Sequence, residues 1–142
     1  MVFSSDSDLR IILPAVFSYG IASFEQYHAT AAAELIRDIR RYWIPRQSTI
    51  LLKNFNQDKL DSSQWVRAAC FRVLAYHALP RLVLEVTKTD TTPDFKTLIS
   101  TYRANYREEI DNVITDGVYY DTGKGLMRIE SISIAESQRL IR

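Results

Sequence analysis

The stretch DSSQWVRAACFRVLAYHALPRLVLE, residues 61–85, decides the fold of this chain. It has the length and composition of a helix, and its apolar side chains cover nearly the whole circumference. A surface helix carries one apolar stripe and a polar back, whereas a helix that is apolar all round is buried. We therefore predict a mainly α protein, in which a compact bundle of about four helices surrounds this central buried helix.

Pro80 interrupts the apolar pattern of the central helix. Proline has no backbone N–H to donate, and its ring clashes with the carbonyl four residues earlier, here that of Tyr76. Two alternatives are open at this point. Either the helix kinks at Pro80, or a second helical piece begins there and runs to Val86.

Two helices are expected before the central one. The spacing of Ser5 and Asp8 matches a capping box, which predicts a short helix to about Leu13. The same spacing at Ser23 predicts the start of a longer helix, which ends near Trp43 because the following Ile44 precedes a proline. Residues 46–60 form a connector in which we expect an extended piece at residues 49–53.

The remaining helix and the C-terminal part follow from local signals. Thr92, Pro93 and Asp94 predict a helix start, and Asp61 predicts the cap of the central helix with Gln64 at its third position. Gly117 predicts a left-handed stop. Residues 118–130 then read as strand, turn and strand. A two-stranded hairpin alone is only marginally stable, so this one needs its own helices or another chain as a partner. We expect one domain, residues 1–130, and a C-terminal arm, residues 131–142, either extended or a short helix.

Composition restricts the class of protein. The chain has 142 residues with one cysteine and two histidines, which excludes an internal disulfide and the Cys/His spacing of a zinc site. A formal net charge of +1 gives no global field for nucleic acid or an anionic membrane. No apolar run reaches the roughly 18 residues of a membrane span. Acids stand where a signal peptide has a basic region, so we expect a soluble, intracellular product.

Two glycine-containing motifs resemble known binding sites only in part. Gly123-Lys124-Gly125 lacks the first glycine of a phosphate-binding loop, where Val118 stands, and has Gly125 in place of the hydroxyl residue, which favours a hairpin turn. A calcium loop beginning at Asp121 would place glycines at two ligand positions and Ile132 at the position of the bidentate glutamate. We expect neither site, and no cofactor.

No catalytic constellation is expected either. Cys70 and His77 lie on one helix about 10 Å apart along its axis, too far for a nucleophile–base hydrogen bond. We expect Cys70 to be a small core residue, His77 to be hydrogen-bonded, and His28 to lie beside an apolar stripe without a partner motif. Arg72 points into the expected core, where an unpaired charge is very costly. We favour an ion pair inside the domain, and a face that becomes buried against another subunit is the alternative.

A cluster of arginines surrounds Trp43. Glu34 and Asp38 are interleaved with the cluster and are expected to pair with it along the helix, which favours a solvated helix end. The alternative is a patch that faces DNA or an acidic protein surface. The cluster consists of Arg37, Arg40, Arg41 and Arg46.

The order of these landmarks resembles the small head–tail adaptor (connector, or head-completion) proteins of tailed bacteriophages. The resemblance covers about residues 5–125. Its landmarks are SDSDLRIILPAVFSYG (5–20), RRYWIPR (40–46), LDSSQWVRAACFRVLAYHALPRL (60–82), DFKTLISTYRANYREEIDNVI (94–114) and DGVYYD (116–121). The most specific positions are Gln64, Trp65, Tyr76, Leu79 and Pro80 in the central helix, and Tyr102, Tyr106, Gly117, Val118, Tyr120 and Asp121 after it.

The resemblance implies a function by assembly rather than chemistry, so no enzyme is expected. It implies a helical domain repeated as a homo-oligomeric ring, commonly of twelve copies, in the virion neck between capsid and tail. The ring would bind the portal protein and tail or neck proteins, and genomic DNA would pass through it without sequence-specific binding. Such a protein would be made in the host cytoplasm. The alternative function is a small helical nucleic-acid-binding or regulatory protein that uses the arginines at 37–46.

Two surfaces are expected to make the contacts of such a ring. One is the arginine cluster, as an interface or DNA-channel patch. The other is the hairpin with the arm, represented by Tyr119, Tyr120, Asp121, Met127, Arg128, Ile129, Ile132, Ile134 and Leu140.

Overall fold

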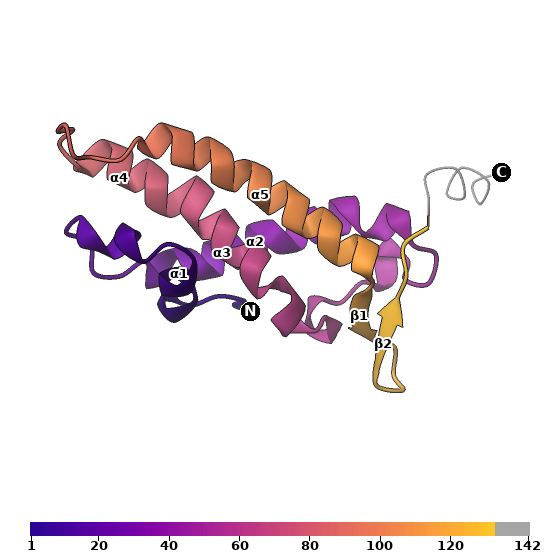
Figure 1. The fold of residues 1–142 in the computed structure, drawn as a ribbon. Coiled ribbons are helices and arrows are strands. Elements are labelled where there is room, and N and C mark those ends of the chain that lie inside the picture. Colours follow the sequence, from indigo (N-terminus) through magenta and orange to yellow (C-terminus); the bar gives the residue numbers. More distant parts are fainter. Residues whose placement is uncertain (133–142) are drawn as a thin grey trace.

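The computed structural model describes residues 1–132 and shows a mainly helical protein with one small β-hairpin (Figure 1). The predicted fold class is confirmed. The longer helices and the strands are α1 (Asp6–Ile12), α2 (Glu25–Tyr42), α3 (Val66–Val73), α4 (Leu79–Glu85), α5 (Phe95–Asp116), β1 (Val118–Asp121) and β2 (Leu126–Ile129).

The central helix is continuous through Pro80. A π-helical turn, Leu74–Ala78, joins α3 to α4, and Pro80 lies in the first turn of α4. A π turn changes the hydrogen-bond spacing at a point where proline removes a donor, so the helix does not break. Figure 1 shows α3 and α4 as one rod beside α5, with α2 on its other side. The central helix is not buried along its whole length, because Leu84, near the C-terminal end of α4, is 86% exposed.

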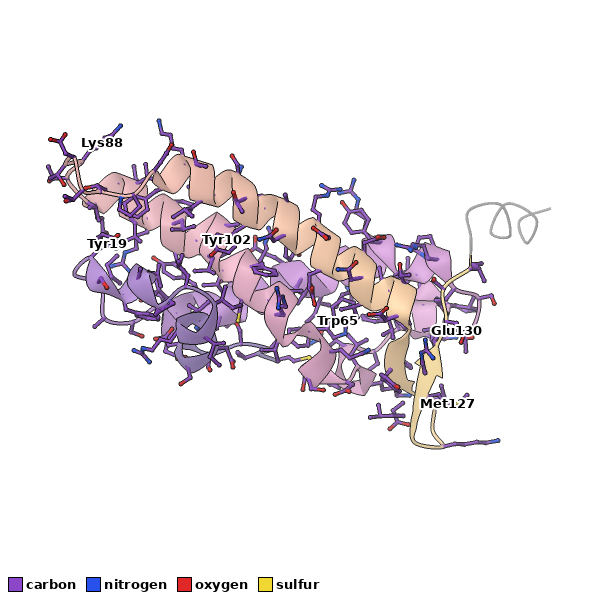
Figure 2. All side chains as sticks on the ribbon, viewed as in Figure 1. Tyr19, Trp65, Lys88, Tyr102, Met127 and Glu130 are labelled. Carbon is purple, nitrogen blue, oxygen red and sulfur yellow. The ribbon has the colours of Figure 1, made fainter. Side chains whose placement is uncertain are left out.

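The core lies along this rod in two adjoining parts. At one end, Leu74, Leu79 and Leu82 pack with Phe24 and residues of α1. At the other end, Trp65 and Trp43 pack with the hairpin. Figure 2 shows Trp65 beneath α3, Met127 on the hairpin and Lys88 at the opposite end of the molecule.

Three local predictions were wrong in detail. The longer helix is α2, and its N-cap is Phe24 without a side-chain cap; Ser23 precedes it, where its Oγ accepts from Glu25 N–H and donates to Asp6. The connector contains 3-10 turns, one of them Leu52–Asn54, where an extended piece was expected. Helix α5 is capped by Asp94, two residues after the predicted Thr92.

Two other local predictions, at the start of α1 and at the end of α5, are confirmed. Ser5 and Asp8 form the predicted capping box of α1. Gly117 ends α5 with φ of 103°, a conformation that favours glycine. Among the described residues, no helix is both long and apolar enough to span a membrane.

Candidate interaction surface at the hairpin end

The predicted strand, turn and strand of residues 118–130 are present as an antiparallel hairpin. Val118 pairs with Ile129 and Asp121 pairs with Leu126, so the turn runs from Thr122 to Gly125. Asp121 Oδ1 accepts a hydrogen bond from Gly123 N–H within the turn. This local bond accounts for Asp121 as a turn residue.

The inner face of the hairpin packs on its own chain. Tyr120 and Ile129 are 3% and 5% exposed, and the Tyr120 ring lies 5.8 Å from that of Trp43. The Tyr120 hydroxyl also accepts a hydrogen bond from Asn56 N–H. The prediction that Tyr120 and Ile129 contact a partner is therefore corrected, because both side chains belong to the core of this domain. The partner that the hairpin needs is its own chain.

The outer edge of β1 is covered as well. Asp61 N–H donates to Tyr119 O, while Gln64 accepts from Tyr119 N–H and donates to Gly117 O. Gln64 thus bridges to the hairpin instead of closing a capping box on the central helix, although Asp61 does cap the 3-10 turn before α3. Arg128 lies opposite Tyr119 in the register, so its backbone groups also point away from the partner strand, towards the outer edge of β2.

Arg128 has an intramolecular function. Its Nε donates to Asp116 O at the end of α5, and its side chain lies directly over Gly117. A cation at this position stabilises the negative end of the helix dipole. Arg128 therefore holds the hairpin against α5.

Three apolar side chains of the hairpin remain exposed. Tyr119, Leu126 and Met127 are 39%, 56% and 50% exposed, and we call them the hairpin tip. The sequence prediction included Tyr119 and Met127 but missed Leu126, which the alternation of strand side chains could have indicated. Ile132 is half-buried, and its N–H donates to Arg46 O. Ile134 and Leu140 lie outside the described residues.

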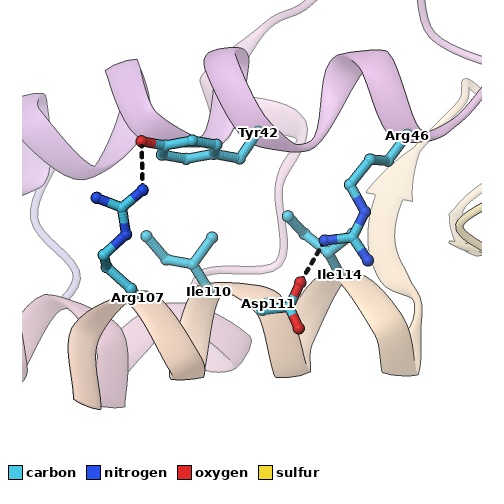
Figure 3. Close-up of a pocket in the computed structure, with 6 residues that line it drawn as sticks. All are labelled: Tyr42, Arg46, Arg107, Ile110, Asp111 and Ile114. Carbon is cyan, nitrogen blue, oxygen red and sulfur yellow. Dashed lines mark hydrogen bonds and ion pairs between the residues drawn. The ribbon is translucent and has the colours of Figure 1, made fainter. Parts of the chain in front are cut away.

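A pocket lies next to the hairpin, between the end of α2 and α5 (Figure 3). Its volume is about 210 Å³, and Ile110 and Ile114 of α5 lie between two polar bridges. On one side, Arg107 donates to the Tyr42 hydroxyl over 3.1 Å. On the other, Arg46 pairs with Asp111. The pocket is therefore apolar between two polar margins.

The structure separates the four arginines of the predicted cluster. Arg46 belongs to the pocket through its pair with Asp111. Arg37, Arg40 and Arg41 are exposed on the outer side of α2, and we call them the arginine face. The expected pairing of this face with Glu34 and Asp38 was wrong, because both acids point to the other side of the helix.

These acids surround Arg72 inside the bundle. Arg72 pairs with Glu34 and lies 3.7 Å from Asp38, and its guanidinium Cζ is 3.8 Å from the ring centroid of Tyr76. His77 forms a hydrogen bond with Glu34, and the Tyr106 hydroxyl donates a hydrogen bond to Asp38. The internal pair that we predicted for Arg72 and the hydrogen bond predicted for His77 are confirmed. We call Glu34, Asp38, Arg72, His77 and Tyr106 the inner cluster.

The cluster shifts the acidity of its members. Burial alone would raise the pKa of Glu34, but the hydrogen bonds and charges of Arg72 and His77 outweigh it and lower the pKa below its usual value. Burial raises the pKa of Tyr106, and its hydrogen bond to Asp38 raises it further. Glu34 is therefore held as a carboxylate and Tyr106 as a neutral donor. Burial also raises the pKa of Cys70 to about 12, as expected for an unreactive core thiol.

A second polar cluster, missed by the sequence reasoning, joins α1 to α2. Ser4 Oγ lies 2.6 Å from His28 Nδ1, and His28 Nε2 lies 3.0 Å from Asp6 Oδ1. These contacts have the order of a Ser–His–Asp triad. However, the three residues are 5%, 1% and 7% exposed, so a substrate has no route to the hydroxyl. Only tertiary structure brings residues 4, 6 and 28 together, and no local spacing signals it.

The same cluster has some of the ligand types of a cation site. Ligand atoms of Asp6, Glu25 and His28 lie within 4.8 Å of one another. Both carboxylates already serve helix ends, because Asp6 accepts from Phe24 N–H before α2 and Glu25 accepts from Asp6 N–H in α1. Burial would raise the pKa of Asp6, but the bonds from His28, Ser23 and Phe24 together lower it. This reciprocal capping accounts for the cluster as a link between two helices.

In comparisons with known proteins, no family model, curated protein or solved structure matches the chain.

Proposed function

We propose that the chain is a structural virion protein of a phage neck, a head–tail adaptor whose copies form a ring that links the portal to the tail and continues the DNA channel. The observation that carries the proposal is the presence of two unlike surfaces near one end of a helical domain. One is the exposed hairpin tip, and the other is the pocket between α2 and α5. The resemblance of the ordered landmarks supplies the link to phage adaptors.

Two unlike surfaces are what a ring requires. In a head-to-tail contact, each subunit offers one surface to the preceding copy and a different one to the next, and the ring closes if the rotation allows it. We assign the hairpin tip as the projecting surface and the pocket as the receiving surface. Leu126 or Met127 of one copy would enter the pocket of its neighbour.

The size and lining of the pocket suit this role. Small-molecule sites usually measure about 300–1,000 Å³, and this pocket, at about 210 Å³, is smaller. Ile110 and Ile114 form the base of the pocket but are only 3% and 0% exposed, so a partner would meet mainly the Tyr42 ring and the pairs Tyr42–Arg107 and Arg46–Asp111 around it. An apolar centre with a polar rim is the usual arrangement of a protein–protein contact.

The outer edge of β2 supports the same assignment. An edge strand can extend its ladder with a segment of a neighbouring chain. Residues 60–64 already cover β1, and within residues 1–132 no other strand pairs with the outer edge of β2. Contacts in the ring would thus combine backbone pairing with insertion of side chains from the tip.

The experiment is negative-stain microscopy and mass photometry of the protein, alone and with the portal of the virus that encodes it. The proposal expects rings on the portal, and Leu126→Ser combined with Met127→Ser should abolish them. Leu84→Ser is the matched control, because Leu84 is 86% exposed at the other end of the bundle. Rings that survive the hairpin changes, or that disappear equally in the control, would contradict the proposal.

A further inference from the structure

The arginine face carries positive charge that the rest of the domain leaves uncompensated. Within residues 1–132, no ion pair holds Arg37, Arg40 or Arg41. Arg40 lies over the ring of Phe55 and Arg41 over that of Tyr42, at 5.3 and 5.4 Å from the centroids. Stacking on a ring face leaves the in-plane N–H donors of a guanidinium available for a ligand.

A pocket opens beside two of these arginines. Its volume is about 410 Å³, and no residue that lines it is acidic. Ala29 and Ala33 are small, so the surface of α2 next to the guanidinium groups is low and a ligand can approach closely. The lining residues are Met1, Ala29, Ala33, Ile36, Arg37, Arg40 and Gln57.

We propose that the arginine face, with the pocket beside Gln57, binds phosphate groups of a nucleic-acid backbone. The planar guanidinium fork matches phosphate oxygens and can bind them through two parallel hydrogen bonds. The Gln57 side-chain amide adds a neutral donor at the pocket. No base-reading element is part of the site, so the binding is independent of sequence.

The energetics of α2 agree with a bound anion. Arg37 and Arg41 are four residues apart on one helix, a spacing at which like charges destabilise the helix. The acids that could offset this repulsion serve Arg72 instead. An anion on the arginine face offsets the repulsion from outside. Because only the charge and geometry of one chain are involved, the arginine face binds phosphate whether or not the copies form a ring.

The test is fluorescence anisotropy with a labelled 20-base-pair duplex of arbitrary sequence, measured from 50 to 200 mM salt. The variant changes Arg37, Arg40 and Arg41 to Gln. The control changes Lys88, Lys96 and Lys124 to Gln, which removes the same net charge from exposed positions elsewhere. Thermal unfolding followed by circular dichroism checks that each variant is folded.

We expect the arginine variant to weaken duplex binding at least about tenfold at 50 mM salt and to reduce the slope of log K against log salt by about 0.9 for each phosphate that the variant no longer neutralises. The control should retain most of the affinity and the slope. Equal weakening in both variants would overturn the proposal, because net charge alone would then explain binding. Unchanged binding in the arginine variant would also overturn it. Isothermal titration with inorganic phosphate forms the second arm. A protein that binds inorganic phosphate but does not bind the duplex would reject nucleic acid as the ligand.

Discussion

Helix α2 carries charged side chains on two sides, and the two sides differ completely in how those charges are satisfied. The inner cluster collects Glu34 and Asp38 around Arg72, with His77 and Tyr106 as further hydrogen-bond partners. The arginine face, within the same turns of the helix, holds three cations and no acid. The difference teaches that interleaved charges in a sequence need not neutralise each other, because a buried arginine on another helix competes for the acids.

The largest effect is expected when the inner cluster loses one partner. Glu34→Gln removes the carboxylate that pairs with Arg72, and breaking a buried ion pair costs about 3–5 kcal/mol. Because Glu34 is partly accessible, we expect a loss of unfolding free energy near the lower value. Urea denaturation measures it, and the double change Glu34→Gln with Arg72→Met should recover part of the loss. A loss below about 0.5 kcal/mol, the usual range of a surface substitution, would show that the cluster does not stabilise the fold.

A smaller effect is expected for Tyr106→Phe. The hydroxyl donates to Asp38, and a hydrogen bond to a charged group contributes about 1.5–3 kcal/mol. In this variant Asp38 still has Arg72 at 3.7 Å as a charged neighbour. We therefore expect the unfolding free energy to fall by about 1.5 kcal/mol, the lower end of that range, in the same denaturation experiment. Tyr102→Phe is the control on the same helix, because its half-buried ring stacks on Phe71 and should tolerate the change. Equal losses in both variants would rule out the bond to Asp38 as the cause.

The pH dependence of the unfolding free energy should report on Glu34 in the inner cluster. The pKa of Glu34 is lowered in the folded state, so its contribution is present above the unfolded pKa of about 4.3 and is lost as pH falls through the lower, folded value. Unfolding free energy should therefore decrease from pH 6 to pH 3, and the decrease should be shallower in Glu34→Gln. Parallel curves for the two proteins would contradict the assignment of this carboxylate.

The smallest effect is expected on the arginine face. Arg37 has no ion pair among the described residues, so Arg37→Gln should change the unfolding free energy by less than about 0.5 kcal/mol. Denaturation at low salt is the measurement, because any relief of repulsion with Arg41 is greatest there. A loss above about 1 kcal/mol would mean that Arg37 has a structural role.

Part of this structure could be predicted from local patterns. The all-round apolar character of residues 61–85 indicated the central helix, and the same burial argument predicted an internal partner for Arg72. The hairpin followed from the change of period after Gly117. Each of these features depends on a pattern within one segment or on the cost of one buried group.

The remainder depends on how segments pack against one another. The rotation of α2 about its axis decides that Glu34 faces Arg72 rather than Arg37, and that rotation is set by the whole apolar core. The contact of Ser4 and Asp6 with His28 also needs two helices in place. Tyr120 was assigned to a partner because an isolated hairpin needs a covering surface, and the local pattern does not say whether its own chain or another one provides it. In the fold, Trp43 and Phe55 of the same chain cover it.

The central claim is that copies of this domain join head to tail, with the hairpin tip of one in the pocket of the next. Photo-crosslinking tests it most directly, with p-benzoylphenylalanine at position 126 and mass spectrometry of the adducts at high protein concentration. The account predicts adducts between copies that map to the pocket, on peptides containing residues 42–46 or 107–114. Adducts confined to one chain, or between copies at unrelated surfaces, would contradict it.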